Sequence, residues 1–163
     1  MQATEAVLRF AYLSRVRACL PSDAAPRGRI EPMARKRKFG KIIIPVGMKP
    51  RPRQHEIDVA EVLAEHFRVD VEFVPTTARN TPDFLIDGVL WELKSPQGKG
   101  KNNIQRQLKY ASKQSKNIII SASRSKLHIN KIRGELTIQF QKTRSIRRLL
   151  LIDKTDKVME ITR

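Results

Sequence analysis

The segment TPDFLIDGVLWELKSP, residues 81–96, constrains the fold more than any other part of the sequence. Two short apolar runs flank the dipeptide Asp87-Gly88, which is favoured in two-residue hairpin turns, so the segment predicts two antiparallel strands. Because side chains alternate between the two faces of a strand, Glu92 and Lys94 share one face of the second strand. The hairpin brings Asp83, on the first strand, beside them. Charged groups thus converge within otherwise apolar strands.

Hydrophobic periodicity predicts the elements around this hairpin. Apolar residues recur at helical spacing in residues 55–67, 104–117 and 127–141. Further strands are predicted at residues 69–75, 117–123, 147–153 and 157–162. The resulting order is helix, three strands, helix, strand, helix, two strands. We expect an α/β fold with helices flanking a mixed sheet, because a strand that follows a helix can return parallel to an earlier strand through a right-handed crossover.

A chain of 163 residues is one domain by length, and we place that domain at residues 48–163. Residues 1–47 are interpreted as a basic N-terminal extension, either helical or weakly ordered. Its first 20 residues contain Arg and almost no acid, so organellar targeting stays open beside the favoured interpretation, an ordinary helix or extension. No apolar run approaches the roughly 18 residues that a membrane span needs. Cys19 is the sole cysteine, which excludes an internal disulfide bond.

Charge is sorted along the chain, whose formal net charge is +17. Residues 54–94 hold 3 Lys or Arg and 9 Asp or Glu, whereas residues 1–53 hold 13 and 3, and residues 97–148 hold 14 and 1. A chain this basic is expected to meet a polyanion, most often nucleic acid. An acidic block between two basic blocks suits a site that binds a metal ion while its rim attracts phosphate. The alternative, that the basic residues only solvate the surface, stays open.

Glu56 supplies a further carboxylate. On a helical wheel of residues 55–67 it lies in the middle of the apolar stripe, where a carboxylate needs a partner because burying an unpaired charge is costly. The alternative is that Glu56 caps the helix or reaches solvent. Grouped with Asp83 and Glu92, it would complete a set of oxygen ligands for Mg²⁺ or Mn²⁺, beside a lysine that acts on an attacking water. The competing structural interpretation is a Glu92–Lys94 ion pair on an exposed strand face.

The pattern PDF…ELK, after a helix that carries a glutamate and before a further helix and strand, resembles the PD-(D/E)xK nuclease superfamily. That superfamily has the core order αβββαβ. The longer run from RPRQHEIDVAEVLAEHF through TPDFLIDGVLWELKSP to KQSKNIII resembles the C-terminal tRNA nuclease domains of bacterial contact-dependent growth-inhibition toxins, over roughly residues 51–160. The resemblance implies a restriction-endonuclease-like αβββαβ core with an extra C-terminal helix and strands, and a metal-dependent nuclease activity.

The resemblance also implies site residues. The catalytic set would be Glu56, Asp83, Glu92 and Lys94. A Mg²⁺ or Mn²⁺ ion would be held by Asp83, Glu92, the backbone carbonyl of Leu93 and Glu56. The nucleic-acid backbone would be bound by Lys99, Lys101, Arg106, Lys109 and Lys113. Gln107 is an accessory candidate, for which plain helix surface is the favoured interpretation.

Three functions stay open at this point. The leading one is a toxin-like, metal-dependent endoribonuclease with tRNA as its expected substrate. A DNA endonuclease would use the same residues, because metal-assisted attack on a phosphodiester does not require a 2′-hydroxyl. A non-catalytic RNA-binding module is disfavoured, since the chain has only 9 aromatic residues on which bases could stack. We expect action in the cytoplasm, that of a target cell if the domain is delivered, and a cognate immunity protein as a partner.

Overall fold

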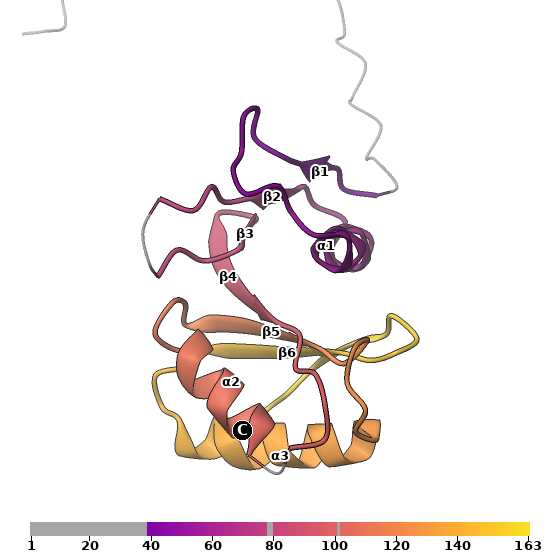
Figure 1. Ribbon diagram of the computed structural model, residues 1–163, viewed down its shortest axis with the longest axis vertical. Helices are drawn as coiled ribbons and strands as arrows, with labels where there is room; N and C mark the ends of the chain where they lie inside the picture. The colour runs from indigo at the N-terminus through magenta and orange to yellow at the C-terminus, as the bar shows by residue number, and fades with distance from the viewer. Residues whose placement is uncertain (1–38, 78–79, 101) are drawn as a thin grey trace, which may run out of the picture. The chain divides into compact units, whose positions relative to one another are not determined.

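A computed structural model describes residues 39–77, 80–100 and 102–163, and these residues form a seven-stranded mixed sheet with helices on both faces (Figure 1). The strands are β1 (Ile42–Ile43), β2 (Val71–Phe73), β3 (Phe84–Ile86), β4 (Val89–Lys94), β5 (Asn117–Ser121), β6 (Arg148–Ile152) and β7 (Val158–Glu160). The helices are α1 (Gln54–Phe67), α2 (Asn103–Ala111) and α3 (Ile129–Lys142). The predicted mixed α/β fold is therefore confirmed.

The strands lie in the sheet in chain order, from β1 to β7. The first half is made locally: β2, β3 and β4 pair antiparallel, and the β3–β4 hairpin turns at Asp87 and Gly88, both with positive φ. The second half uses crossovers, because β4, β5 and β6 run parallel and α2 and α3 connect them. The carboxyl ends of β4 and β5 consequently meet at one edge of the sheet.

Each face of the sheet is covered by its own apolar cluster. On one face α1 packs Val59, Ala60, Leu63 and Ala64 against strand residues that include Trp91 and Leu93. On the other face α2 and α3 cover Ile118, Ile120, Leu149 and Leu151. Alternation along β4 therefore directs Glu92 away from the α1 face, because its neighbours Trp91 and Leu93 belong to the α1 cluster. The alternation of β4 therefore determines which face of the sheet carries the charged residues of the hairpin.

Two features differ from the elements expected from sequence. The helix predicted over 104–117 ends at Ala111, and the chain then turns, with the Ser115 hydroxyl donating to the Leu90 carbonyl at 2.9 Å. The strand β1 is the second difference, because it lies within residues 1–47, for which the sequence predicts an N-terminal extension. It pairs parallel with β2, and the Gly40 amide donates to the Ala64 carbonyl at 3.2 Å.

Candidate active site

Asp83 lies where the pairing of β3 with β4 ends. Its amide donates to the carbonyl of Trp91 at 3.0 Å, and its carboxylate Oδ2 accepts from the amide of Leu93 at 2.8 Å. Pro82 precedes it and has no amide hydrogen, so backbone pairing does not continue through that residue. Burial raises the pKa of Asp83, while the hydrogen bond from Leu93 and the charge of Lys94 oppose the rise. The side chain is thereby fixed against the middle of β4.

Glu92 and Lys94 form an ion pair on the same face of β4, as the alternation predicted. Glu92 is only 1% exposed, and its Oε1 accepts from the Lys94 ammonium. Burial, and then the charge of Asp83, raises the pKa of Glu92 to about 7. Its second oxygen, Oε2, is buried and has no hydrogen-bond partner among the described residues. An acceptor of this kind is costly unless something else binds it.

Gln114 completes the surroundings of Lys94 and was not expected from the sequence. Its Oε1 accepts from the Lys94 ammonium at 3.1 Å, and its amide nitrogen lies 3.5 Å from the Thr81 carbonyl. Gln107, the accessory candidate, lies half-buried on α2. The glutamine that contacts the site thus comes from the turn after α2. Local periodicity gives no signal for this contact, because it depends on where the helix ends.

Glu56 lies at the first turn of α1 and not in the core. Its Oε2 accepts from the Arg53 amide at 2.8 Å, which is the capping arrangement left open above, and its side chain is 29% exposed. Its charge nevertheless contributes to the raised pKa of Asp83, so the two carboxylates lie within electrostatic reach. Among the described residues, no three His, Cys, Asp or Glu side chains are grouped closely enough to form a metal cage. Asp83 and Glu92 are the carboxylates at the centre of the site.

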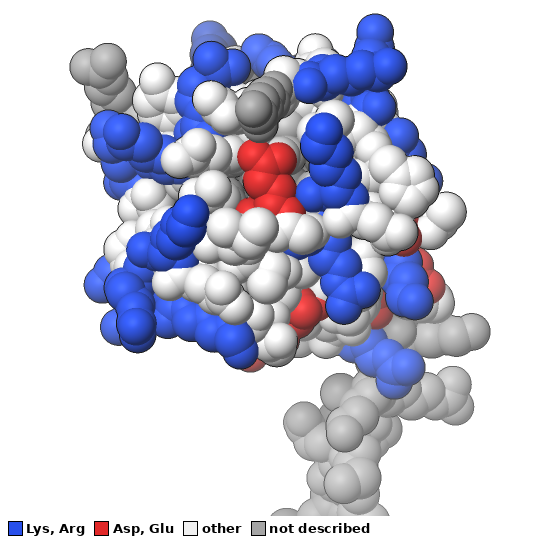
Figure 2. Space-filling view, turned by 90° about the horizontal axis from the view of Figure 1, so that it is seen from below, with Lys and Arg blue, Asp and Glu red and all other residues white. Residues whose placement is uncertain are grey.

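Basic side chains are exposed on the segments that follow β4. Lys99 lies exposed in the loop after β4, and Arg106, Lys109 and Lys113 are exposed on α2 and just beyond it, whereas Lys101 lies outside the described residues. Figure 2 shows one face of the molecule on which Lys and Arg flank a small patch of Asp and Glu. The distribution suits contact with a polyanion.

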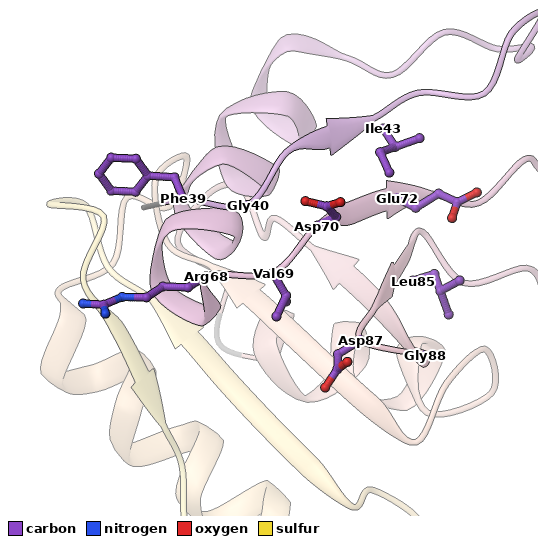
Figure 3. Close-up of a pocket in the computed structure, with 10 residues that line it drawn as sticks. All are labelled: Phe39, Gly40, Ile43, Arg68, Val69, Asp70, Glu72, Leu85, Asp87 and Gly88. Carbon is purple, nitrogen blue, oxygen red and sulfur yellow. The ribbon is translucent and has the colours of Figure 1, made fainter. Parts of the chain in front are cut away.

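Two hollows differ in their relation to this centre. One, of about 340 Å³, is lined by Gln114 and by the basic residues Lys113, Lys116 and Arg147. The other, of about 1000 Å³, lies along β1 and β2 and contains none of the predicted site residues (Figure 3). Its lining includes Asp70, Glu72 and Asp87. Gln114, which lines the smaller, basic hollow, is also bonded to Lys94, so that hollow lies next to the candidate active site.

Comparisons with known proteins concern the family and the fold. Residues 79–158, which include Asp83, Glu92 and Lys94, match the family described as the contact-dependent growth inhibition CdiA C-terminal domain. The fold is similar to that of a CdiA-CT/CdiI toxin and immunity complex from Burkholderia pseudomallei, with a TM-score of 0.52 and 18% identity over 76% of this chain and 99% of the other. Among curated proteins, none matches this sequence. Within the described residues, every helix is too short or too polar to cross a bilayer.

Proposed function

We propose that this chain is a toxin domain of the contact-dependent growth-inhibition type and that it acts as a metal-dependent endoribonuclease on tRNA. The observation that carries the proposal is the group formed by Asp83, Glu92 and Lys94, in which a buried carboxylate with a raised pKa lies between a second carboxylate and an ammonium. Perturbed acids that converge at one place are typical of catalytic sites. The match of residues 79–158 to a toxin family supports the same proposal.

The donor set fits a hard divalent ion. Glu92 Oε2 is a buried oxygen without a partner among the described residues, and the charge of Asp83 acts on the same carboxylate. Mg²⁺ is commonly held by one or two carboxylates, with water and substrate phosphate as its other ligands. In this proposal Asp83 and Glu92 hold Mg²⁺ or Mn²⁺ with the Leu93 carbonyl, and Glu56 holds a water of the ion from the first turn of α1. Such an ion would polarise the phosphate and lower the pKa of a bound water.

Lys94 has a defined task in this proposal. Its ammonium donates to Glu92 and Gln114, which hold the nitrogen in one position. An ammonium has three hydrogens, so one remains for the attacking water or for the oxygens of the phosphate as their charge increases. A donor held in place before the reaction stabilises developing charge without reorganisation. Gln114 is therefore assigned as a positioning residue for Lys94.

Substrate binding is assigned to the basic surface. The hollow lined by Lys113, Lys116 and Arg147 opens next to Gln114, so a phosphate backbone bound there would pass close to Lys94. Contacts with phosphate supply affinity and strong salt dependence without base specificity. Arg106 and Lys109 on α2 extend this surface, and Lys99 adds to it from the loop after β4. RNA is the assigned substrate, whereas DNA cleavage on the same site is the alternative that the assay below separates.

We infer the place of action and the partner by analogy with the matched family and with the similar solved structure. The similar solved structure is a toxin bound to an immunity protein. We extend this arrangement to the present chain and assign it a cognate immunity protein and action in the cytoplasm of a target cell. A charge of +17 favours an acidic immunity protein, because opposite charges accelerate association.

A cleavage assay tests the proposal. Purified protein is incubated with total tRNA, plasmid DNA and single-stranded DNA, in Mg²⁺, in Mn²⁺ or in EDTA. We expect discrete tRNA fragments that disappear with EDTA and in Glu92→Gln, and that persist in Glu65→Gln, a matched change at an exposed position of α1. If only DNA were cleaved, DNA rather than RNA would be the substrate. Tight, salt-sensitive binding without any cleavage would refute the enzymatic proposal.

A further inference from the structure

Arg124, in the loop after β5, is held by two side chains from other parts of the fold. Its Nη1 lies 3.3 Å from His55 Nε2, at the first turn of α1. With the Gln97 amide oriented to satisfy its hydrogen bonds, the Gln97 oxygen accepts from Arg124 at 3.0 Å from Nη1 and 3.1 Å from Nε. A guanidinium only donates, so His55 Nε2 is the acceptor in this contact. An exposed arginine is thus fixed in one position.

The two loops that carry this arrangement are tied to each other. Gly98 and Ser125 form an isolated parallel bridge, which continues the alignment of β4 with β5 beyond the ends of the strands. The Asn103 amide nitrogen donates to the Gln97 carbonyl at 2.5 Å, and so fixes the loop to the start of α2. On the other loop the Ser121 and Ser123 hydroxyls lie 2.9 Å apart. The position of Arg124 is therefore set by backbone and side-chain contacts on both sides.

The charge of Arg124 is not neutralised by the groups that hold it. Among the described residues Arg124 itself forms no ion pair with a carboxylate. The His55 Nε2 that it contacts lies 3.9 Å from Glu56 Oε1. Arg148 shows the ordinary structural alternative, since its guanidinium is 3.1 Å from the Glu160 carboxylate and stacks on Trp91. A guanidinium that is ordered without a direct carboxylate partner retains part of its donor fork for an anion.

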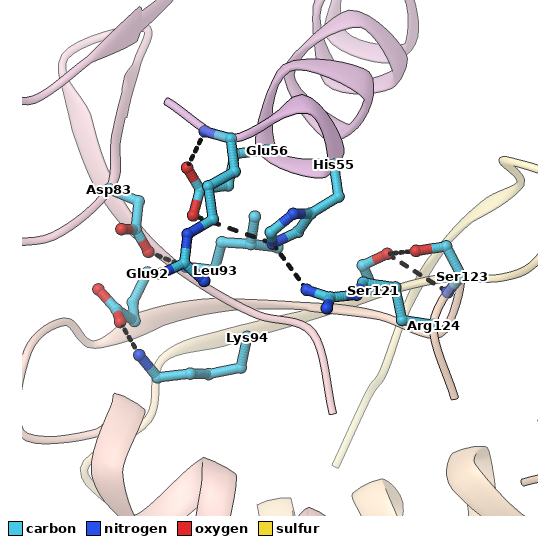
Figure 4. Close-up of polar contacts among 10 residues, drawn as sticks. His55, Glu56, Asp83, Glu92, Leu93, Lys94, Ser121, Ser123 and Arg124 are labelled. Carbon is cyan, nitrogen blue, oxygen red and sulfur yellow. Dashed lines mark hydrogen bonds and ion pairs between the residues drawn. The ribbon is translucent and has the colours of Figure 1, made fainter. Parts of the chain in front are cut away.

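The location of Arg124 connects it with the candidate active site. In Figure 4 the His55–Arg124 pair lies on the opposite side of Glu56 from Asp83 and Glu92. The pair is at the carboxyl ends of the parallel strands β4 and β5, the edge at which ligands commonly bind in open α/β sheets. The Gly98–Ser125 bridge also brings the chain at Lys99 alongside the chain at Lys126, and both are exposed. Positive charge thus continues from Arg124 along this edge.

We propose that Arg124 binds a phosphate of the nucleic-acid strand other than the one that is cleaved, and that His55 and Gln97 are the residues that position it. This inference rests on the proposed nuclease function, and it adds a second point at which the substrate is held. One strand would then pass from the basic hollow beside Lys113, across the carboxylates, to Arg124. Two fixed phosphate contacts on either side of the reacting bond align it with the catalytic groups.

Binding to a cleavage-deficient protein tests the inference separately from catalysis. Fluorescein-labelled total tRNA is titrated with Glu92→Gln protein, and with the same protein carrying either Arg124→Gln or Arg133→Gln. Arg133 is exposed on α3, so the second double variant loses the same charge at another place. We expect Arg124→Gln to weaken binding about tenfold relative to Arg133→Gln and to reduce the slope of log K against log salt by about one. Equal affinities and slopes in the two folded double variants would overturn the inference while leaving the nuclease proposal intact.

Variants of Arg124 and His55 separate the position of the guanidinium from its charge. Arg124→Lys keeps the charge, so the salt slope is expected to remain, while affinity falls because the fork is lost. His55→Ala leaves Arg124 in place but less ordered, so affinity is expected to fall with an unchanged slope. In cleavage-competent protein, Arg124→Gln should raise KM by a larger factor than it lowers kcat. A lower kcat with an unchanged KM would overturn the assignment. If Glu92→Gln protein binds neither tRNA nor single-stranded DNA, the nuclease proposal fails, and this inference fails with it.

Discussion

The burial of Glu92 links the stability of the fold to pH. The pKa of this side chain is raised from 4.5 to about 7, first by burial and then by the charge of Asp83. The folded protein therefore holds a proton that the unfolded chain has already released at intermediate pH. The stability that this proton provides is fully present below the unfolded pKa of 4.5 and is lost as pH rises through about 7. From about pH 5 to about pH 8, this one group should lower the free energy of unfolding by about 2.5 kcal/mol.

Glu92→Gln removes this titration and preserves an oxygen that can accept from Lys94. Between about pH 5 and about pH 8, the free energy of unfolding of the variant should therefore fall by about 2.5 kcal/mol less than that of the parent. The assay is urea unfolding in EDTA, followed by circular dichroism, so that no divalent ion offsets the buried charge. Glu65→Gln, which changes an exposed glutamate on α1, is the matched control and should follow the parent at both pH values. If the stability of Glu92→Gln depended on pH as that of the parent does, the assignment of Glu92 as a buried carboxyl group with a raised pKa would be refuted.

Further predictions concern the ion, the positioning residue and the packing. Mg²⁺ at about one hundred times its dissociation constant should raise the free energy of unfolding of the parent by about 2.7 kcal/mol and leave that of Glu92→Gln unchanged. Chemical denaturation measures both values, and an equal rise in the two proteins would place the ion elsewhere. Gln114→Ala should lower kcat about tenfold with little change in KM, since it frees the Lys94 ammonium but removes none of the basic side chains of the hollow. An unchanged kcat in tRNA cleavage would show that Lys94 needs no such support. Gly40→Ala should destabilise the fold by about 2 kcal/mol, because the added Cβ would lie 1.7 Å from the Val69 carbonyl oxygen; a parent-like urea midpoint would contradict that close approach.

Sequence patterns predicted the parts of this structure that depend on short-range order. The hairpin followed from Asp87-Gly88, and the shared face of Glu92 and Lys94 followed from strict alternation in β4. Glu56 shows the limit of this reasoning. A helical wheel places it on the apolar stripe, but the first turn of a helix has unsatisfied amides, and the carboxylate bonds to one of them instead of facing the core.

The remaining site contacts are made between segments that are distant in sequence. Gln114 reaches Lys94 only because α2 ends at Ala111 and the chain turns back over β4. Arg124 meets His55 across 69 residues, through the alignment of the parallel strands. No local periodicity encodes either contact. The two-residue strand β1 is likewise defined by its partner β2, since so short a segment has no pattern of its own.

The division of the sheet into a locally paired half and a crossover half has a consequence for the order in which the protein folds. Hairpins close within microseconds, whereas parallel strands that are joined through helices must first lose the entropy of a long connection. The hairpin of β3 and β4 carries Asp83, Glu92 and Lys94, so these side chains can meet early, while Gln114 and Arg124 arrive only when β5 docks beside β4. During refolding, catalytic competence should consequently appear together with the slow pairing of β4 and β5, after most of the antiparallel structure has already formed.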